Sequence, residues 1–416
     1  MSYFFVLGSN LALSMEEIRS VLPPTGWRRL WLRGQVLAVE TYDELDPEGL
    51  MSRLGGTIKV GRIVDQEANL DSEMLSVRLA ELAGERADGG RLTFGYSIYA
   101  AHDGKAAAAT GRLRRCGMEI KRRLKENELT SRWVRPTTGP ALTSVSVAKN
   151  GLLSPGGAEF VIAVDDGGKR CSIGLTAAVQ PFEEFSELDY GRPERDARRG
   201  MLPPKLARIM LNLARVSPDS TVWDPFCGSG TVISEALLLG VEHMFGSDVD
   251  RQAVKDAQAN VDWLKDRRRT STALPEPKMF VSDAAAASKE VKAGSISAIV
   301  TEPYLGRPRN GREDRQELNR RLNELTGMYA RALTAWLGSL TADATLVLAL
   351  PVYVDSRGNL MGVELGLMTR DGYELDLPPA ADGKLTDGQR GPNGGLMYGR
   401  PGQFVWREIV RLRPKG

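Results

Sequence analysis

The sequence predicts an α/β protein with a doubly wound parallel sheet in its C-terminal half, preceded by smaller α+β modules. Two observations carry this prediction. From Met201 onward, helical and strand-like segments alternate, which is the pattern of a parallel sheet covered by helices. In addition, 416 residues exceed the roughly 250–300 at which one hydrophobic core stops growing, so the chain should divide into domains.

The first part of the chain predicts a ferredoxin-like unit, because its elements follow the order β-α-β-β-α-β. Ser14 and Glu17 have the spacing of a capping box, which favours a helix that begins there and ends at Leu22, before two prolines. A second helical pattern over 45–56 ends at two glycines. The strand-like segments are 3–8, 30–41, which suits one or two strands, and 57–64. We expect this first domain over residues 1–70.

Residues 71–179 predict a second α+β region, and the polar stretch 180–200 reads as a linker to the region 201–416. An amphipathic helix is expected at 72–84 and a basic helix at 110–127. The strand-like segments of this second region are 91–101, 143–151 and 158–179. In the C-terminal region, the expected strands are 221–226, 243–250, 278–285, 296–304 and 344–352, and a hairpin-like end covers 396–412.

Charge is distributed unevenly along a nearly neutral chain. The formal net charge is only +2, yet Arg112 to Lys125 holds seven basic residues against the single Glu119. A local basic stripe of this kind suits contact with nucleic acid, and the alternative is an ordinary solvated helix face.

Several classes of protein are disfavoured by composition. No stretch approaches the ~20 apolar residues of a membrane span, and the N-terminus lacks the pattern of a signal peptide. The three cysteines are scattered, and two histidines argue against a His-based zinc site. We expect a cytoplasmic protein with reduced thiols and no bound metal.

The segment VWDPFCGSGT, residues 222–231, predicts a ligand-binding loop at the end of a strand. Gly228 and Gly230 lack a Cβ, so backbone can approach a ligand closely. A dinucleotide fingerprint would need glycine at position 233, which is Ile233, and the lysine of a P-loop is absent. The loop therefore does not predict a pyrophosphate site.

Carboxylates mark the ends of three successive predicted strands. Asp224 suits a cationic or amine-bearing ligand, Asp248 suits a ribose diol, and Asp283 suits an adenine amino group. This arrangement resembles the S-adenosylmethionine site of Rossmann-like methyltransferases. Cys227 reads as a small loop residue.

The segment IVTEPYLGRP, residues 299–308, resembles the [N/D]-P-P-Y loop of amino-methyltransferases. In that loop, oxygen acceptors hold the two N–H groups of an exocyclic base amine, and an aromatic ring stacks on the extruded base. Here Pro303 and Tyr304 match, whereas Thr301 and Glu302 depart from the pattern. Three interpretations follow: Glu302 is the acceptor, the Thr301 hydroxyl or a backbone carbonyl is the acceptor, or the loop has lost its chemistry.

Taken over nearly its whole length, the chain resembles the THUMP-domain tRNA guanosine N2-methyltransferases that modify guanosine 10. The segments that carry this resemblance are 3–22, 54–61, 189–214, 224–231, 246–250, 282–284 and 396–412. The resemblance implies a ferredoxin-like domain over 1–70, a THUMP domain over 71–179 and a Rossmann-like class I methyltransferase domain over 201–416.

The resemblance also implies site residues and partners. S-adenosylmethionine would be the cofactor and tRNA the substrate, and some relatives use a small zinc-binding activator subunit. The target guanine would face Thr301, Glu302, Pro303 and Tyr304. The implied cofactor-binding residues are Met201, Leu202, Asp224, Phe226, Gly228, Gly230, Thr231, Asp248 and Asp283. The implied RNA-binding residues are Arg114, Arg115, Lys121, Arg122 and Arg307, with Arg309 as a further candidate.

Two alternatives stay open on the sequence. One is an N-methyltransferase for another nucleobase in RNA or DNA, and the other is a non-catalytic RNA-binding protein with a degenerate methyltransferase loop.

Overall fold

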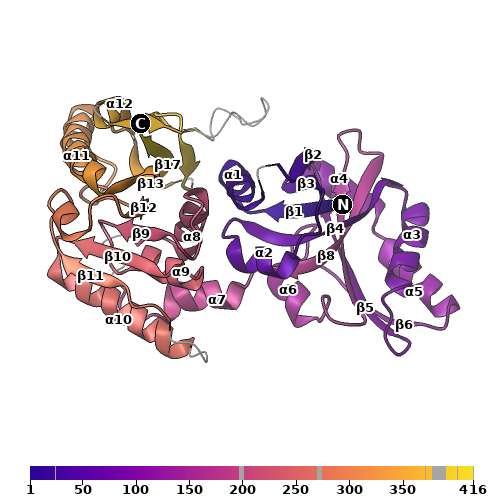
Figure 1. Cartoon of the computed structure of the whole chain (residues 1–416). Helices are drawn as coiled ribbons and strands as arrows, with labels where there is room; N and C mark the ends of the chain where they lie inside the picture. The colour runs from indigo at the N-terminus through magenta and orange to yellow at the C-terminus, as the bar shows by residue number, and fades with distance from the viewer. Residues whose placement is uncertain are drawn as a thin grey trace. The chain divides into compact units, whose positions relative to one another are not determined.

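The computed structural model describes residues 1–23, 25–195, 201–268, 274–370, 372–376, 390–400 and 402–415. The chain divides into two compact units, which are coloured by position along the chain in Figure 1. The N-terminal unit combines Met1–Leu11 with Leu22–Phe182, and the C-terminal unit combines Ala12–Val21 with Glu183–Gly416. The chain therefore passes between the units three times.

The N-terminal unit is built on one eight-stranded sheet with the order β2-β3-β1-β4-β8-β7-β5-β6. Its strands are β1 (Ser2–Leu7), β2 (Trp27–Arg33), β3 (Val36–Thr41), β4 (Thr57–Asn69), β5 (Arg91–Tyr99), β6 (Thr130–Val134), β7 (Gly157–Val164) and β8 (Arg170–Val179). Its helices are α2 (Pro47–Arg53), α3 (Ser72–Gly84), α4 (Asp103–Arg112), α5 (Cys116–Glu126) and α6 (Ser144–Lys149).

Strand β4 connects the two predicted N-terminal domains, because it pairs with β1 on one side and β8 on the other. The expected β-α-β-β-α-β order is present over the first part of the chain. The same hydrogen-bonded sheet nevertheless continues across residue 70. The ferredoxin-like and THUMP assignments, and the boundary between them, stay predictions.

Two local predictions in the N-terminal half are wrong. Residues 143–151 were expected as a strand and instead contain α6, whose N-cap Thr143 accepts a hydrogen bond from the Ser146 amide. Alternation of Val145 and Val147 with serine imitates the two-residue period of a strand. The expected capping role of Ser14 also fails, because α1 (Leu11–Val21) already begins at Leu11 and Ser14 is buried within it.

Helix α1 belongs to the C-terminal unit although it lies near the start of the chain. Leu13 packs in the same core cluster as the side chains of α8 (Pro204–Leu213). The buried Glu17 carboxylate accepts a hydrogen bond from Asn212 Nδ2 at 2.7 Å, and Arg411 Nη1 lies 3.3 Å from Glu16 Oε1. Helix α1 is therefore part of the C-terminal core.

The C-terminal unit has a doubly wound sheet with the order β11-β10-β9-β12-β13-β17-β15. Strands β9 to β13 pair in parallel, and β17 is antiparallel to β13. The strands are β9 (Thr221–Asp224), β10 (His243–Asp248), β11 (Lys278–Val281), β12 (Ile296–Thr301), β13 (Leu340–Val354), β14 (Leu360–Gly362), β15 (Tyr373–Leu375), β16 (Leu396–Tyr398) and β17 (Val405–Pro414).

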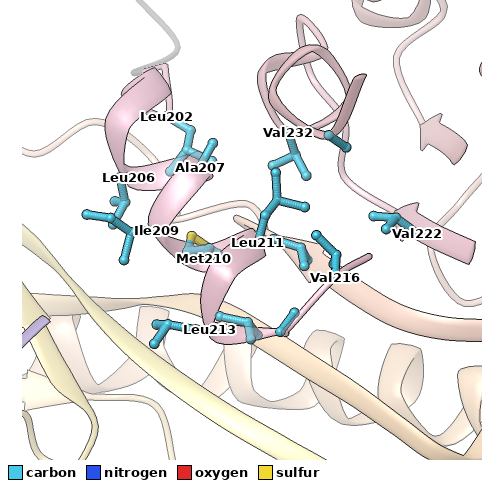
Figure 2. Close-up of a cluster of buried hydrophobic side chains, with 14 of the residues drawn as sticks. Leu202, Leu206, Ala207, Ile209, Met210, Leu211, Leu213, Val216, Val222 and Val232 are labelled. Atoms are coloured by element: carbon cyan, nitrogen blue, oxygen red, sulfur yellow. The ribbon is translucent and has the colours of Figure 1, made fainter. Parts of the chain in front are cut away.

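Helices cover both faces of this sheet, as strand alternation requires (Figure 1). Val222 of β9 joins a core with α8, α9 and α10, whereas the next residue, Trp223, joins the opposite core with α11. Figure 2 shows the first of these cores, where apolar side chains of α8 gather near Val222 and Val232. The helices of this unit besides α1 and α8 are α7 (Phe182–Ser186), α9 (Thr231–Leu238), α10 (Arg251–Arg267), α11 (Arg315–Trp336) and α12 (Leu365–Thr369).

None of the helices in the described part of the chain is both long enough and apolar enough to span a membrane.

Candidate functional site

A pocket of about 890 Å³ opens at the carboxyl ends of the parallel strands in the C-terminal unit. Both singled-out loops line it, the glycine loop after β9 and the loop after β12. A volume of roughly 300–1,000 Å³ is usual for small-molecule sites, and strand ends are where open α/β sheets bind ligands. The expected site residues that line it are Met201, Leu202, Asp224, Phe226, Gly228, Thr231, Asp248, Asp283, Glu302, Pro303, Tyr304 and Arg307.

The two glycines of the first loop have different tasks. Gly228 has a φ of +50°, and its amide donates a hydrogen bond to Asp248 Oδ2 at 3.0 Å. Space for a Cβ is open at this position, so the backbone presents a bare surface to the pocket. Gly230 does not line the pocket; it begins α9 with a φ of +80°, and a Cβ there would lie 3.0 Å from the Cβ of Ala257. The cofactor contact of Gly230 stays a prediction, and in the structure this glycine allows α9 to pack closely against α10.

Asp224 is a buried carboxylate at the tip of β9. It accepts hydrogen bonds from Thr301 Oγ1 at 2.6 Å and from the Phe226 amide at 3.1 Å. Burial raises the pKa of Asp224 to about 7, because an ionised carboxylate loses its hydration there. No lysine or arginine among the described residues forms an ion pair with it. Asp224 can therefore change its protonation state near neutral pH.

Asp248 and Asp283 stand at the ends of the next two strands. Asp248 Oδ1 accepts from the Asp250 amide at 2.9 Å, and Asp283 Oδ1 accepts from the Ala285 amide at 2.9 Å. These backbone bonds fix both carboxylates, whose remaining lone pairs are available to further donors. Both side chains line the pocket, where they suit a ligand that carries hydroxyl or amino groups.

Cys227 has no nucleophilic task in this pocket. Burial, together with the charges of Asp224 and Asp248, raises the pKa of its thiol well above the ordinary value. The thiol therefore stays protonated, and the interpretation of Cys227 as a small loop residue fits its surroundings.

The loop after β12 is held by two buried tyrosines. Tyr329 donates its hydroxyl hydrogen to the Tyr304 carbonyl at 2.5 Å, and Tyr353 donates to the Leu305 carbonyl at 2.9 Å. Gly306 has a φ of +94°, and a Cβ there would collide with the Tyr353 hydroxyl. The Tyr304 side chain, in contrast, is 53% exposed and free to meet a flat ligand.

Thr301 does not face the pocket as expected. Its side chain is fully buried, and its hydroxyl hydrogen is committed to Asp224. The interpretation in which this hydroxyl accepts a substrate N–H therefore has no geometric support. Thr301 instead fixes the orientation of Asp224 from the neighbouring strand β12.

Glu302 lines the pocket and forms a bidentate ion pair with Arg407 of β17. Arg407 Nε lies 2.6 Å from Glu302 Oε1, and Arg407 Nη2 lies 3.1 Å from Oε2. Their side chains are 12% and 11% exposed, and both border the pocket. Burial raises the pKa of Glu302, and the Arg407 charge opposes that rise.

Comparison with known proteins identifies this part of the chain. Residues 192–346 match the model of the UPF0020 family, described as RMKL-like, methyltransferase domain. The matched segment lies within the C-terminal unit and covers less than half of the chain. The α/β class and the Rossmann-like methyltransferase fold predicted from the sequence are thereby confirmed.

Curated relatives match a segment of similar size. The tRNA (guanine(10)-N2)-dimethyltransferase of Methanothermobacter thermautotrophicus is 28% identical over 156 residues, which cover 38% of this chain and 40% of that protein. The protein of the same name from Methanocaldococcus jannaschii is 33% identical over 128 residues, which cover 30% of this chain and 35% of that protein. The matches thus span well under half the length of these two relatives.

The fold of the whole chain is also found in a solved structure. The crystal structure of TrmN from Thermus thermophilus aligns over 100% of both chains with a TM-score of 0.51 and 16% identity. At that identity the likeness concerns the fold.

Sequence reasoning missed two residues that lie at this pocket or support its lining. Arg407 lies 105 residues after Glu302, and no local motif connects them. Arg192 was assigned to the linker, yet its side chain is buried and donates to Thr231 Oγ1 at 2.7 Å and to the Met201 sulfur at 3.1 Å. Arg192 thus supports two pocket-lining residues from behind. The remaining linker residues 196–200 lie outside the described residues.

Two arginines follow the segment 301–304, which we call the TEPY loop, and they differ in whether a phosphate could reach them. Arg307 is exposed at the pocket of the UPF0020 domain. Arg309 is not available to a phosphate as expected, since its side chain is 1% exposed and Nη1 donates to the Val354 and Phe404 carbonyls.

The predicted RNA-binding residues of the basic segment lie in the N-terminal unit. Arg114 and Arg115 are exposed between α4 and α5, and Lys121 is half-buried on α5. Arg122 is also exposed but pairs with Glu119 at 3.0 Å and Glu126 at 2.5 Å. The single basic helix expected over 110–127 is divided, with α4 ending at Arg112 and α5 beginning at Cys116.

Proposed function

We propose that this protein transfers the methyl group of S-adenosylmethionine to the exocyclic N2 amine of a guanosine in tRNA, at position 10. The observation that carries the proposal is the meeting of the glycine loop and the TEPY loop in one pocket of a UPF0020 domain. The guanine N2 amine and tRNA are supported by the names of the curated relatives.

The residues of the pocket fit S-adenosylmethionine. Gly228 leaves a surface that a Cβ would obstruct, and Asp248 and Asp283 offer fixed acceptors for a ribose diol and an adenine amine. Asp224, Met201 and Leu202 line the remaining side, where the positively charged methionine part would lie. When bound, S-adenosylmethionine would supply an electrophilic methyl group to the N2 amine.

The TEPY loop would hold the guanine. We assign Glu302 as the acceptor of an N2–H bond, since its carboxylate is at the pocket wall and Thr301 is turned away. Such an acceptor stabilises the positive charge that develops on the amine. Tyr304 would stack on the extruded base. The hydrogen bond from Tyr329 to the Tyr304 carbonyl would hold the backbone from which the ring projects. Arg307 would meet a phosphate beside that base.

The test is labelled methyl transfer by the purified full chain to unmodified tRNA, followed by nuclease digestion and mass spectrometry of the nucleosides. We expect N2-methylated guanosine, and we expect its loss when guanosine 10 is replaced in the transcript. Methylated adenosine would support the alternative amine chemistry and overturn the guanine assignment. Cofactor binding without transfer, both alone and with added cell extract that contains any activator subunit, would favour a non-catalytic RNA-binding protein.

A further inference from the structure

The Glu302–Arg407 pair is a departure of this chain from the [N/D]-P-P-Y pattern, and it is built into two separate strands. Glu302 follows β12, and Arg407 reaches it from β17 across the intervening strand β13. Both side chains are mostly buried, yet both border the pocket. A fork of two N–H donors on a carboxylate fixes the plane of the carboxylate as well as its charge.

This carboxylate retains acceptor capacity toward the pocket. An ionised carboxylate has about four lone-pair sites, of which the Arg407 fork uses two. Within the part of the chain that the structure describes, no other hydrogen bond reaches Glu302. An acceptor-only group with open lone pairs is therefore presented to whatever enters the pocket.

We propose that Arg407 is a positioning residue that holds the Glu302 carboxylate as a fixed acceptor, and that this acceptor reads the donor edge of guanine. That edge consists of the exocyclic N2 amine and the adjoining ring N1–H. The inference rests on the proposed function and names the feature of the base that the site distinguishes.

The chemistry of the base edge gives this pair its selectivity. Guanine presents donors at both N1 and N2, and both suit a carboxylate. Adenine presents a donor at N6 beside a lone pair at N1, which a fixed carboxylate repels. Glutamine at position 302 would offer one acceptor and one donor, and so would lose this distinction.

The groups around Glu302 explain why Arg407 is needed. Besides Arg407, the ionisable groups whose charges interact with Glu302 are Asp224 of β9, Tyr329 of α11 and Tyr398 of β16. None of these three brings a positive charge. Without Arg407, burial would raise the pKa of Glu302 further, and a protonated carboxyl group would present a hydroxyl donor in place of an acceptor.

The first experiment compares Arg407→Met, Arg407→Lys and the control Arg413→Met in the full chain. Arg413 lies on the same strand, is 44% exposed and pairs with Asp376 away from the pocket. We expect Arg407→Met to lower kcat/KM for tRNA by about 100-fold at pH 7, a loss typical of one transition-state contact. Its pH–rate profile should move to higher pH, whereas Arg407→Lys should restore the profile in part and Arg413→Met should behave as wild type.

Binding of S-adenosylhomocysteine by calorimetry completes this experiment, and its affinity should stay within about 2-fold in all three variants. A pH–rate profile of Arg407→Met that coincides with wild type would overturn the positioning role.

The second experiment alters the transcript, and its main comparison uses the unaltered chain. The target guanosine in the transcript is replaced by 2,6-diaminopurine riboside, which keeps the N2 amine but carries a lone pair at N1. We expect at least a 10-fold lower kcat/KM on this transcript, equal to about 1.4 kcal/mol, and a smaller ratio for Glu302→Gln. Equal rates on the two transcripts would overturn the inference while leaving the proposed function intact. Absence of guanosine methylation by the wild type would overturn the proposed function itself.

Discussion

Two buried carboxylate–cation pairs, one in each unit, show how similar chemistry serves different ends. In the N-terminal unit, Glu159 receives hydrogen bonds from Lys59, Ser97 and Thr176, and the ion pair is completely buried. In the C-terminal unit, Glu302 borders a pocket and, among the residues that the structure describes, accepts side-chain hydrogen bonds from Arg407 alone. A pair whose acceptors are filled from all sides stabilises a sheet, whereas a pair with open acceptors is available to a ligand.

The completely buried Lys59–Glu159 pair is expected to contribute to the stability of the fold. Lys59→Met leaves the Glu159 charge buried without a cation, so we expect a loss of about 3–5 kcal/mol in the free energy of unfolding. Guanidinium denaturation followed by circular dichroism measures it. The control is Arg62→Met, which breaks an exposed pair with Glu44 and should cost less than about 1 kcal/mol. Equal losses in the two variants would remove the distinction between buried and exposed pairs.

The Glu302–Arg407 pair, which borders the pocket, is expected to contribute to catalysis. Glu302→Ala is expected to lower kcat by about 10²–10³-fold, because the amine loses its acceptor in the transition state. Calorimetry should find the affinity for S-adenosylhomocysteine unchanged. Glu317→Ala on the surface of α11 provides the matched control, since that carboxylate pairs only with Arg320 and Arg321 of its own helix. Normal turnover by Glu302→Ala would contradict the assignment of the acceptor.

Asp224 is a third kind of buried carboxylate, to be compared with Glu159 and Glu302. Its partners are the Thr301 hydroxyl and the Phe226 amide, and none of the described lysines or arginines forms an ion pair with it. Its folded-state pKa of about 7 lies above the ordinary aspartate value of 3.8. Such a group contributes stability at low pH that is lost as pH rises toward 7. Relative to Asp224→Asn, the wild type should therefore lose about 3–4 kcal/mol between pH 4 and pH 8. Parallel stability curves for the two proteins would show that folding does not raise the pKa of Asp224.

The smallest effect is expected from the basic segment of the N-terminal unit. Arg114 and Arg115 are exposed, whereas Arg122 is occupied by two glutamates of its own helix. We expect Arg114→Ser/Arg115→Ser to weaken tRNA binding a few-fold and to reduce the salt slope by roughly 1–2. Arg122→Ser should have less effect in the same filter-binding titration. Unchanged affinity in the double variant would mark this segment as a solvated helix surface.

The sequence allowed prediction of pocket residues that lie next to one another in the chain or at successive strand ends. It did not allow prediction of hydrogen bonds between residues far apart in the chain. The glycine loop and its three acids were predicted because each lies directly after a strand, and parallel strands bring such ends together. The bond from Thr301 to Asp224 spans 77 residues, and that from Arg407 to Glu302 spans 105. Neither follows from local spacing, since both depend on the order in which the strands pair.

Gly230 illustrates a different limit. The same residue type in the same motif lines the pocket at Gly228 and permits a close helix contact at Gly230. Both positions have positive φ, so conformation alone does not separate the two tasks. The difference lies in what surrounds each Cα, which is open space at one glycine and Ala257 at the other.

The position of α1 has a consequence for the order in which the protein matures. Leu13 and Glu17 leave the ribosome long before Asn212, with which Glu17 bonds, and before Arg411, which reaches Glu16. The C-terminal unit therefore completes its hydrophobic core with one of the earliest segments of the chain. We expect a fragment that begins at Glu183 to expose the apolar surface that α1 covers. Because the C-terminal unit combines two separate stretches of the chain, cutting the chain at one place does not release that unit intact.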